Sequence, residues 1–244
     1  TSTVISNACI SGVLAIIYAQ DIIESGRYDH VVVIGGDLVT EFTYAGFESF
    51  FALSPTACKP FDEHREGLSL GEAVTSLVLS RDQNAFKNPL IVKGGATAND
   101  ANHISGPSRN GEGLYRAIHK CLERSKVRKD DIDFISAHGT ATRYNDDMES
   151  IAFSRHGLND VSVNSFKGYY GHTLGTAGVL EVALSMQSIR NNMLVKSFGC
   201  ETPGTSEKIN VLMQNQHKDV NTVLKTASGF GGCNSVLVLS KPEI

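Results

Sequence analysis

The amino-acid sequence predicts a layered α/β protein made of two related halves. Short β-branched stretches, which are typical of strands, alternate along the chain with longer apolar stretches, which are typical of buried helices. This alternation is expected when helices pack on sheets. The stretch from Gly71 to Arg81 also aligns with the stretch from Gly231 to Lys241, at an offset of 160 residues (231 − 71). Because such self-similarity indicates duplication, we expect one half in residues 1–84, shorter and incomplete, and the other in residues 85–244.

Composition and charge are those of an ordinary globular protein. The chain has 244 residues, of which 41% are hydrophobic and 20% charged, enough for a core in each half. A net charge of −4 gives no basis for binding nucleic acid or an anionic membrane, and no apolar run is long enough to span a bilayer. Five Cys without paired spacing favour a reducing, cytoplasmic compartment. The Cys and His residues do not have the spacing of zinc ligands, so we expect no zinc site.

In the first half, a short β-branched run leads into an apolar helix. That helix is expected from about Ile10 to Glu24, and apolar residues cover most of its circumference, so it should be buried. The continuous run Val31–Gly36 is typical of a strand in a parallel sheet covered on both faces. The aromatic-rich stretch Phe42–Leu53 is expected to contain a short helix, and a second strand is expected over Ala73–Ser80.

The second half repeats the alternation of strands and helices on a longer scale. Strands are expected near Leu90–Lys93, Ile132–Ser136, Val161–Asn164, Val223 and Val236. Helices are expected over Gly113–Ser125, Asp146–His156 and Leu174–Ile189, the last of them long and apolar. The remaining segments, including Ser165–His172, are expected to be loops.

Cys9 lies where the first strand meets the buried helix. Unpaired backbone N–H groups and the helix dipole favour an anion in a first helical turn, so we expect the Cys9 thiol to lose its proton more easily than usual. The thiolate is the nucleophilic form. An inert buried Cys is the alternative, and it is the commoner fate of a single Cys.

Three further junctions carry reactive or donor groups. They hold His138, Lys167 together with His172, and the glycine-rich turn Gly229–Gly232. One Cys and two neutral imidazoles suit thioester chemistry, in which the thiolate accepts the acyl group and the imidazoles stabilise negative charge on a carbonyl oxygen. Taken singly, each residue has a plainer interpretation as a structural His, a surface Lys or a tight turn. The combination favours catalysis.

Together these stretches resemble the β-ketoacyl-acyl carrier protein synthases, the condensing-enzyme branch of the thiolase-like proteins. The resemblance covers nearly the whole chain and implies the duplicated α/β/α/β/α layers of that fold. It is carried by five stretches, namely Asn7–Gly12 (N-A-C-I-S-G), Pro60–Glu72 (P-F-D…G…G-E), His138–Glu149 (H-G-T-A-T…D…E), Lys167–Glu181 (K…G-H…G-T-A-G…E) and Gly229–Asn234 (G-F-G-G-C-N).

The resemblance implies a role for each matched residue. Cys9 would carry the growing acyl chain as a thioester, while His138 and His172 would hold the malonyl thioester and stabilise the enolate formed as carbon dioxide leaves. Lys167 and Glu181 would order the region around His172. The backbone N–H groups of Cys9 and Phe230 would form an oxyanion hole, with the Phe230 ring as a gate to the acyl pocket.

Substrates and partners follow from the same resemblance. Thr140 and Thr142 would bind the phosphopantetheine arm, which arrives on the acyl carrier protein, so no resident cofactor is expected. A homodimer or heterodimer is expected to form through residues 1–6. Family members carry further residues ahead of the Cys, and without them we expect a chain beginning at Thr1 to expose core surface and to fold poorly or associate.

Departures from the family pattern leave the product and the pathway open. Asn7 and Ile10 replace the usual Thr and Ala beside the nucleophile, and Arg143 and Tyr144 replace Pro and Leu. These changes suit a synthase for polyenes or polyketides as well as one for fatty acids. The nearest alternative is a non-catalytic partner subunit of the same fold, a chain-length factor, which should lack the nucleophile. A degradative thiolase and a Cys–His hydrolase fit the two His less well.

Overall fold

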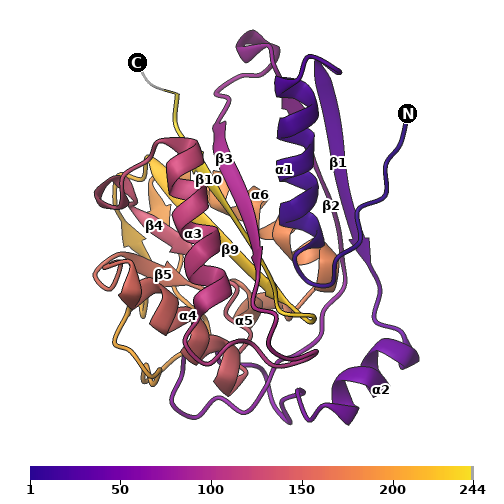
Figure 1. Ribbon diagram of the computed structural model, residues 1–244. Coiled ribbons are helices and arrows are strands. Elements are labelled where there is room, and N and C mark those ends of the chain that lie inside the picture. Colours follow the sequence, from indigo (N-terminus) through magenta and orange to yellow (C-terminus); the bar gives the residue numbers. More distant parts are fainter. Residues whose placement is uncertain (243–244) are drawn as a thin grey trace.

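The computed structural model describes residues 1–242 and shows a layered α/β architecture (Figure 1). The central layer is a six-stranded sheet in which β10 runs antiparallel to β3 and β9, while β4, β5 and β7 run parallel to β9. In sheet order the strands are β3 (Ile91–Asn99), β10 (Cys233–Ser240), β9 (Thr222–Gly229), β4 (Phe134–Ser136), β5 (Ser162–Asn164) and β7 (Asn210–Val211).

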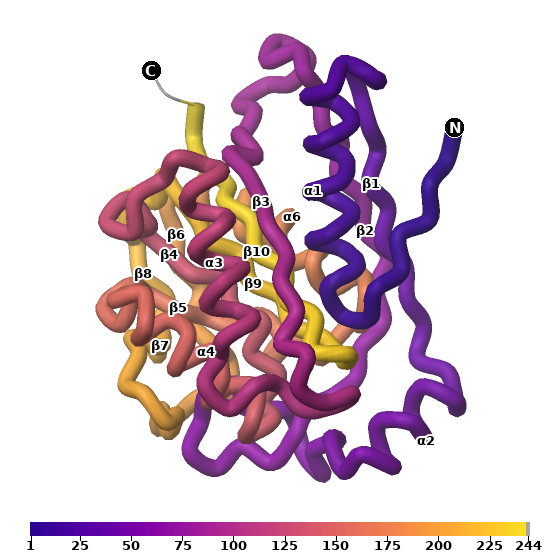
Figure 2. Tube along the Cα trace, in the orientation of Figure 1, coloured from indigo at the N-terminus to yellow at the C-terminus, as the bar shows by residue number. Residues whose placement is uncertain are grey.

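Helices cover both faces of this sheet. On one face α3 (Glu112–Ser125) and α4 (Arg143–Arg155) pack against strand residues such as Ile135 and Val236. On the other face, α1 (Ser11–Glu24) and α6 (Ala177–Asn191) pack against strand residues whose side chains point the opposite way, such as Phe134. Figure 2 shows α1 and α3 on either side of the trace of β3 and β10.

A second sheet lies beyond α1 and α6. It consists of β1 (His30–Asp37) and β2 (Ala73–Ser80), which run antiparallel with Val32 opposite Val78. The four layers are therefore α3/α4, the six-stranded sheet, α1/α6 and the two-stranded sheet, in the thiolase-like order. The predicted layered α/β class is confirmed with four of the five expected layers, whereas the division into halves at residues 84 and 85 stays a prediction.

The two-stranded sheet corrects one expectation. Residues 31–36 were predicted to lie in a parallel sheet covered on both faces, but β1 pairs antiparallel with β2 and alternates between inward and outward residues. Val33 faces α1 and α6 and is buried, whereas Ile34 is 71% exposed. A β-branched run shows that a strand is apolar on both faces, but it does not show what covers the outer face.

Within the α1/α6 layer, the two helix backbones approach each other closely where α1 crosses α6. A Cβ added to Gly12 would lie 2.7 Å from the backbone nitrogen of Val179, and one added to Gly178 would lie 2.5 Å from the backbone nitrogen of Val13. Only glycine fits at either position. This crossing brings the start of α1, which carries Cys9, beside the start of α6.

Other elements match the predicted ones with shifted ends. The helix α2 (Glu41–Ser49) forms in the aromatic-rich stretch, and β3 extends to Asn99, beyond the predicted Lys93. The predicted loop before His172 contains the short helix α5 (Lys167–Tyr170). The remaining short elements are η1 (Gln83–Ala85), η2 (Lys129–Asp131), η3 (Leu174–Thr176), β6 (Met193–Leu194) and β8 (Gln216–His217). Among residues 1–242, none of the helices has the length and apolar character needed to cross a lipid bilayer.

Candidate active site

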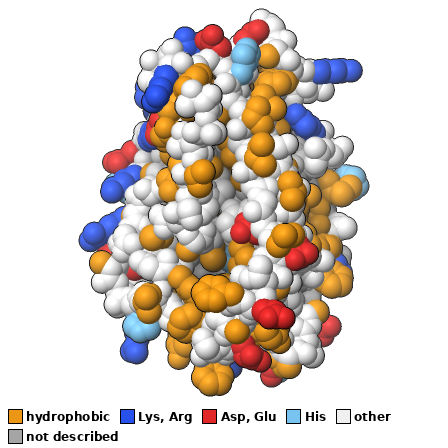
Figure 3. All heavy atoms as spheres, turned by 90° about the vertical axis from the view of Figure 1, so that its right-hand side faces the viewer, with side chains coloured by type: hydrophobic (Ala, Val, Ile, Leu, Met, Phe, Trp, Pro, Cys, Tyr) orange, Lys and Arg blue, Asp and Glu red, His pale blue; other side chains and the backbone are white. Residues whose placement is uncertain are grey.

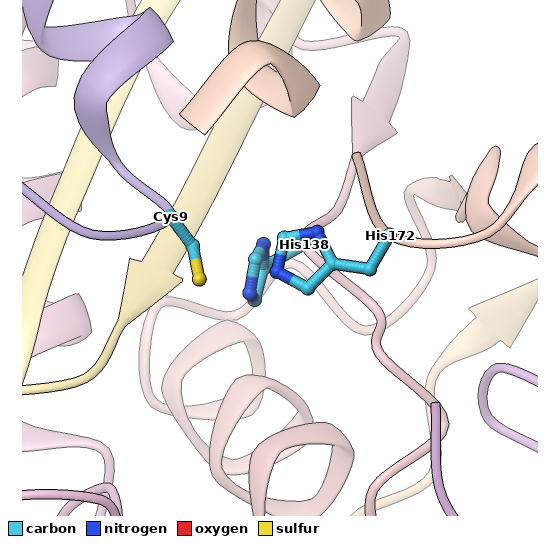
Figure 4. A group of neighbouring side chains, drawn as sticks. All are labelled: Cys9, His138 and His172. Atoms are coloured by element: carbon cyan, nitrogen blue, oxygen red, sulfur yellow. The ribbon is translucent and has the colours of Figure 1, made fainter. Parts of the chain in front are cut away.

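Three predicted site residues meet at the ends of elements from both halves. Cys9 precedes α1, His138 follows β4, and His172 follows α5. Figure 4 shows the Cys9 sulfur pointing toward the two imidazole rings, which stand edge to face. The ligand atoms of the three side chains lie within 4.8 Å of one another, and all three residues are buried. That spacing would also let them hold a metal ion; the expectation of no metal stays a prediction.

The nucleophile sits on a tight turn at the start of α1. Ala8 adopts a left-handed backbone conformation (φ 43°), which is unfavourable for a residue other than glycine. The hydroxyl of Ser11 holds this turn, because it donates to the carbonyl of Ala8 at 2.6 Å and accepts from the N–H of Asn7 at 2.7 Å. The turn aims the Cys9 side chain into the pocket rather than along the helix.

The protonation of Cys9 differs from the sequence-based expectation. Burial raises the pKa of the Cys9 thiol to about 11, although the Lys167 ammonium and the backbone N–H groups of Phe230 and Cys9 act in the opposite direction. The prediction that the helix start makes this thiol more acidic is therefore wrong. Removal of the side chain from water outweighs the dipole and the nearby cation, so the thiol is protonated at neutral pH.

Both imidazoles are neutral at neutral pH. Burial, followed by the charge of Lys167, holds the pKa of His138 and that of His172 well below the ordinary 6.5. The Lys167 ammonium, which can only donate, lies 3.4 Å from Nδ1 of His138, so Nε2 carries the ring proton of His138. Neither ring nitrogen of His172 has a hydrogen-bond partner among the described residues.

Buried carboxylates support the loop that carries His138. Glu149 accepts hydrogen bonds from the backbone N–H groups of His138 (2.8 Å) and Gly139 (2.7 Å). Asp146 accepts from the N–H of Thr140 at 3.0 Å, and burial raises the pKa of this carboxyl to about 7. Both acids come from α4, so that helix fixes the position of the first imidazole.

A buried ion pair supports the same imidazole from the other side. The ammonium of Lys167 lies 2.6 Å from Glu181 Oε1 and donates to the carbonyl of His138 at 2.5 Å. Lys167 is 1% exposed and Glu181 is fully buried, so each charge depends on the other. The structure thus brings Lys167 to His138 as well as near His172.

A cavity of about 740 Å³ opens onto the three residues. Thr140 and Thr142 line it, and their hydroxyls are 2.8 Å apart. Phe230 also lines it, with its ring 5.4 Å from that of Phe47 and 5.3 Å from that of Phe50. The aromatic helix α2 therefore packs on the residue expected to act as a gate, a contact that sequence analysis missed.

Sequence analysis also missed Lys225, a fully buried cation in the middle of β9. Its signal was present in the sequence, since this Lys interrupts an otherwise apolar or small-residue strand, V-L-K-T-A-S. Lysine is almost never fully buried without a partner. The partner, Glu181, is distant in the sequence, so only the fold reveals the pair.

Comparison with known proteins places this geometry in a family. The model of the β-ketoacyl synthase N-terminal domain matches residues 1–85, and that of the β-ketoacyl synthase C-terminal domain matches residues 90–201. The chain belongs to the β-ketoacyl synthase family. The two matched segments follow each other in the order found in a ketosynthase.

Individual ketosynthases match along nearly the whole chain. The chain is 34% identical to the tetracenomycin polyketide synthase ketoacyl synthase alpha subunit of Streptomyces glaucescens, covering 99% of this chain and 60% of that protein. It is 34% identical to a 3-oxoacyl-[acyl-carrier-protein] synthase 2 of Rhizobium meliloti, covering 96% of this chain and 59% of that one. The chain thus spans about 60% of the length of these curated relatives.

A solved structure confirms the fold class. The structure of the ishigamide ketosynthase/chain length factor superposes with a TM-score of 0.93 at 30% identity, covering 99% of this chain and 61% of that one. The layers described above are therefore those of a ketosynthase fold.

Proposed function

We propose that this chain supplies the reaction centre of a β-ketoacyl-acyl carrier protein synthase, which joins an acyl thioester to malonyl-acyl carrier protein by decarboxylative Claisen condensation. The convergence of Cys9, His138 and His172 within 4.8 Å, at the end of one cavity, carries this proposal. The name of the Rhizobium relative, 3-oxoacyl-[acyl-carrier-protein] synthase 2, supports the substrate class.

In the first step Cys9 accepts the acyl group. The thiol is protonated at rest, so its proton must leave as sulfur attacks the acyl carbonyl, and it ends on the departing sulfur of the carrier. The carrier's thiol departs with a proton, and an acyl thioester remains on Cys9. The backbone N–H groups of Cys9 and Phe230 stabilise the oxyanion of this step.

In the second step malonyl thioester loses carbon dioxide. The N–H groups of His138 and His172 donate to the thioester carbonyl, where the enolate charge develops. The resulting carbanion attacks the acyl carbonyl on Cys9, the Cys9 sulfur leaves, and a β-ketoacyl thioester forms on the carrier. Neutral imidazoles suit this step, since an imidazolium would hold the carboxylate that has to leave.

The carrier's arm is proposed to enter past Thr140 and Thr142, whose hydroxyls face the same cavity. Phe230, packed against Phe47 and Phe50, is proposed to separate this entrance from the acyl pocket. A partner subunit is proposed by analogy with the ishigamide pair of ketosynthase and chain length factor. The tetracenomycin relative supports polyketide synthesis, with fatty acid or polyene synthesis as the alternative products.

The test separates the two steps. Intact mass is measured after incubation with an octanoyl-pantetheine thioester, and carbon dioxide release is measured from malonyl-pantetheine. We expect one acyl adduct that is absent from Cys9→Ala. We expect His172→Ala to keep the adduct but to release carbon dioxide about 10²–10³-fold more slowly, the usual effect of losing one oxyanion donor.

The alternative, a non-catalytic chain-length-factor-like subunit, predicts a different outcome. Such a subunit would form no adduct at Cys9 and would release no carbon dioxide above the rate of the double variant Cys9→Ala/His172→Ala. That result in the full natural polypeptide would reject the proposed activity. The presence of the thiol and both imidazoles in one buried cluster favours the catalytic reading.

A further inference from the structure

Lys225 occupies an unusual position for a cation. It lies in β9, the third strand of the six-stranded sheet, with β10 on one side and β4 on the other, and its side chain is fully buried. An unpaired ammonium in such a place would destabilise the fold strongly. The strand must therefore offer Lys225 a specific set of partners.

Those partners belong to the structure that holds the imidazoles. The Lys225 ammonium lies 3.2 Å from the carbonyl oxygens of Ser136 and Ala137, the two residues before His138. It also lies 2.5 Å from Glu181 Oε2, as an ion pair outside ideal hydrogen-bond geometry. Three oxygens thus lie around one ammonium, two as hydrogen-bond acceptors and one as the opposite charge of an ion pair.

Lys225 and Lys167 contact the same carboxylate and neighbouring backbone carbonyls. Lys167 pairs with Glu181 Oε1 and with the carbonyl of His138, while Lys225 pairs with Glu181 Oε2 and with the two preceding carbonyls. Three consecutive carbonyls at the end of β4 are therefore held by two ammonium groups, and one carboxylate bridges those groups.

We infer that Lys225 is a positioning residue of the condensation site, because it completes a buried Lys167–Glu181–Lys225 cluster that fixes the His138 loop and leaves one net positive charge beneath the two imidazoles. This inference rests on the proposed function, since it assigns a role within that reaction. It adds a residue for which the motifs gave no role.

The net charge gives the cluster a chemical effect on the imidazoles. Two ammonium groups against one carboxylate disfavour a third positive charge, so protonation of His138 or His172 becomes harder. The pKa shifts of both imidazoles agree with this effect. Burial lowers each pKa most, and the charges of Lys167 and Lys225 lower it further. Burial also lowers the pKa of Lys225, and the Glu181 carboxylate opposes that change.

Other titratable groups are packed around the cluster and the imidazoles, and each must be kept when Lys225 is changed. They are Cys9, Asp37, Asp146, Glu149 and Tyr170. Substituting Lys225 alone leaves all of them in place, so a change in the pH profile reports the loss of this one charge.

The test compares Lys225→Met with Lys225→Arg in the full natural polypeptide. Carbon dioxide release from malonyl-pantetheine is measured between about pH 5 and pH 9, and octanoyl loading of Cys9 is measured by intact mass. Without the Lys225 charge, the imidazoles protonate more easily. We expect the acid limb of the release profile to move up by about one pH unit or more in Lys225→Met, while Lys225→Arg keeps the original limb.

Two further variants separate charge from structure. Lys241→Met removes an exposed Lys–Asp219 pair just after β10 and should leave the profile unchanged. The double variant Lys225→Met/Glu181→Gln removes one charge of each sign, so Lys167 again leaves one net positive charge. We expect it to bring the acid limb back toward that of the unmodified protein. If Lys225→Met does not fold, Glu181→Gln alone carries the test, because it leaves two positive charges and should move the acid limb down.

The possible outcomes are distinct. An unmoved acid limb in a folded Lys225→Met protein would overturn the inference, as would a double variant whose limb stays shifted. A protein that forms no adduct on Cys9 before any substitution would instead reject the proposed function. A shifted limb with normal loading of Cys9 would support both.

Discussion

Cys9 combines a nucleophilic position with a thiol that is hard to ionise. Its sulfur faces both imidazoles, yet burial raises the pKa of this thiol to about 11. The protein therefore holds Cys9 as a thiol at neutral pH. Such a resting state protects it from oxidation, which acts on the thiolate.

This pKa predicts how Cys9 responds to an alkylating reagent. Below the pKa, each step of one pH unit raises the thiolate fraction about tenfold, and only the thiolate reacts. The rate of carboxamidomethylation of Cys9 by iodoacetamide, followed by peptide mass spectrometry, should therefore rise about a hundredfold from about pH 7 to pH 9. Cys9→Ala serves as the control for the peptide assignment. A rate that levels off near neutral pH would show that the thiol is more acidic than its burial implies.

The sequence predicted most of the site, because the reactive residues lie at junctions with recognisable motifs. Cys9, His138 and His172 converge as expected, and Phe230 lies in the same cavity wall. The electrostatics were not predictable in the same way. The pKa of Cys9 depends on how much of the fold covers it, and Lys225 pairs with a carboxylate on another element, so neither follows from local spacing.

At the scale of elements, the crossing of α1 and α6 positions the nucleophile. Gly12 and Gly178 allow the two backbones to touch, and Asp37 at the end of β1 accepts from the N–H and the hydroxyl of Thr176 at 2.8 and 2.7 Å. The first contact sets the distance between the helices. The second ties the end of β1 to the start of α6.

The crossing predicts a strong effect from one added methyl group. In Gly178→Ala the new Cβ would lie 2.5 Å from the backbone nitrogen of Val13, so the helices must separate. We expect the free energy of unfolding to fall by about 1–3 kcal/mol, as for other overpacked cores. Urea denaturation followed by circular dichroism measures this change.

Gly46→Ala in α2 is the matched control, because nothing lies within 4 Å of its added Cβ. Alanine favours a helix interior over glycine, so this variant should be unchanged or more stable by at most about 1 kcal/mol. Equal stability of the two variants would contradict the close-packed crossing.

Element types were easier to predict than their surroundings. Periodicity identified α1, α3 and α6 and both closing strands, since each covers several turns or pleats. It did not show that β1 pairs antiparallel with β2, because a continuous apolar run suits either direction. It also missed α5, whose four residues are too few for a period to appear.

At the scale of the whole molecule, the outer face of the two-stranded sheet is apolar and exposed. Figure 3 shows hydrophobic side chains along the face that carries these strands. Four of them, all on the outward pleat, are Val32 (59% exposed), Ile34 (71%), Val74 (77%) and Val78 (51%). Apolar faces of this kind mark sites of contact with other protein surface.

This face predicts self-association when the 244 residues are produced by themselves. Sedimentation velocity should show a concentration-dependent shift to larger species, because burying the four side chains removes apolar surface from water. The double variant Val32→Lys/Val74→Lys should reduce that shift. Ile104→Lys changes an exposed apolar residue elsewhere and should leave it unaltered. Identical sedimentation of all three proteins would show that the sheet face does not drive association.

The division of the reaction centre between the two halves has a consequence for folding. Cys9 comes from one half and both imidazoles come from the other, and contacts such as the α1–α6 crossing and the Asp37–Thr176 hydrogen bonds bring them together. A molecule whose halves have formed but not docked would have native strands and helices and no chemistry. Loading of Cys9 followed by carbon dioxide release would therefore measure the fraction of molecules whose halves have docked. Circular dichroism would not distinguish docked from undocked molecules.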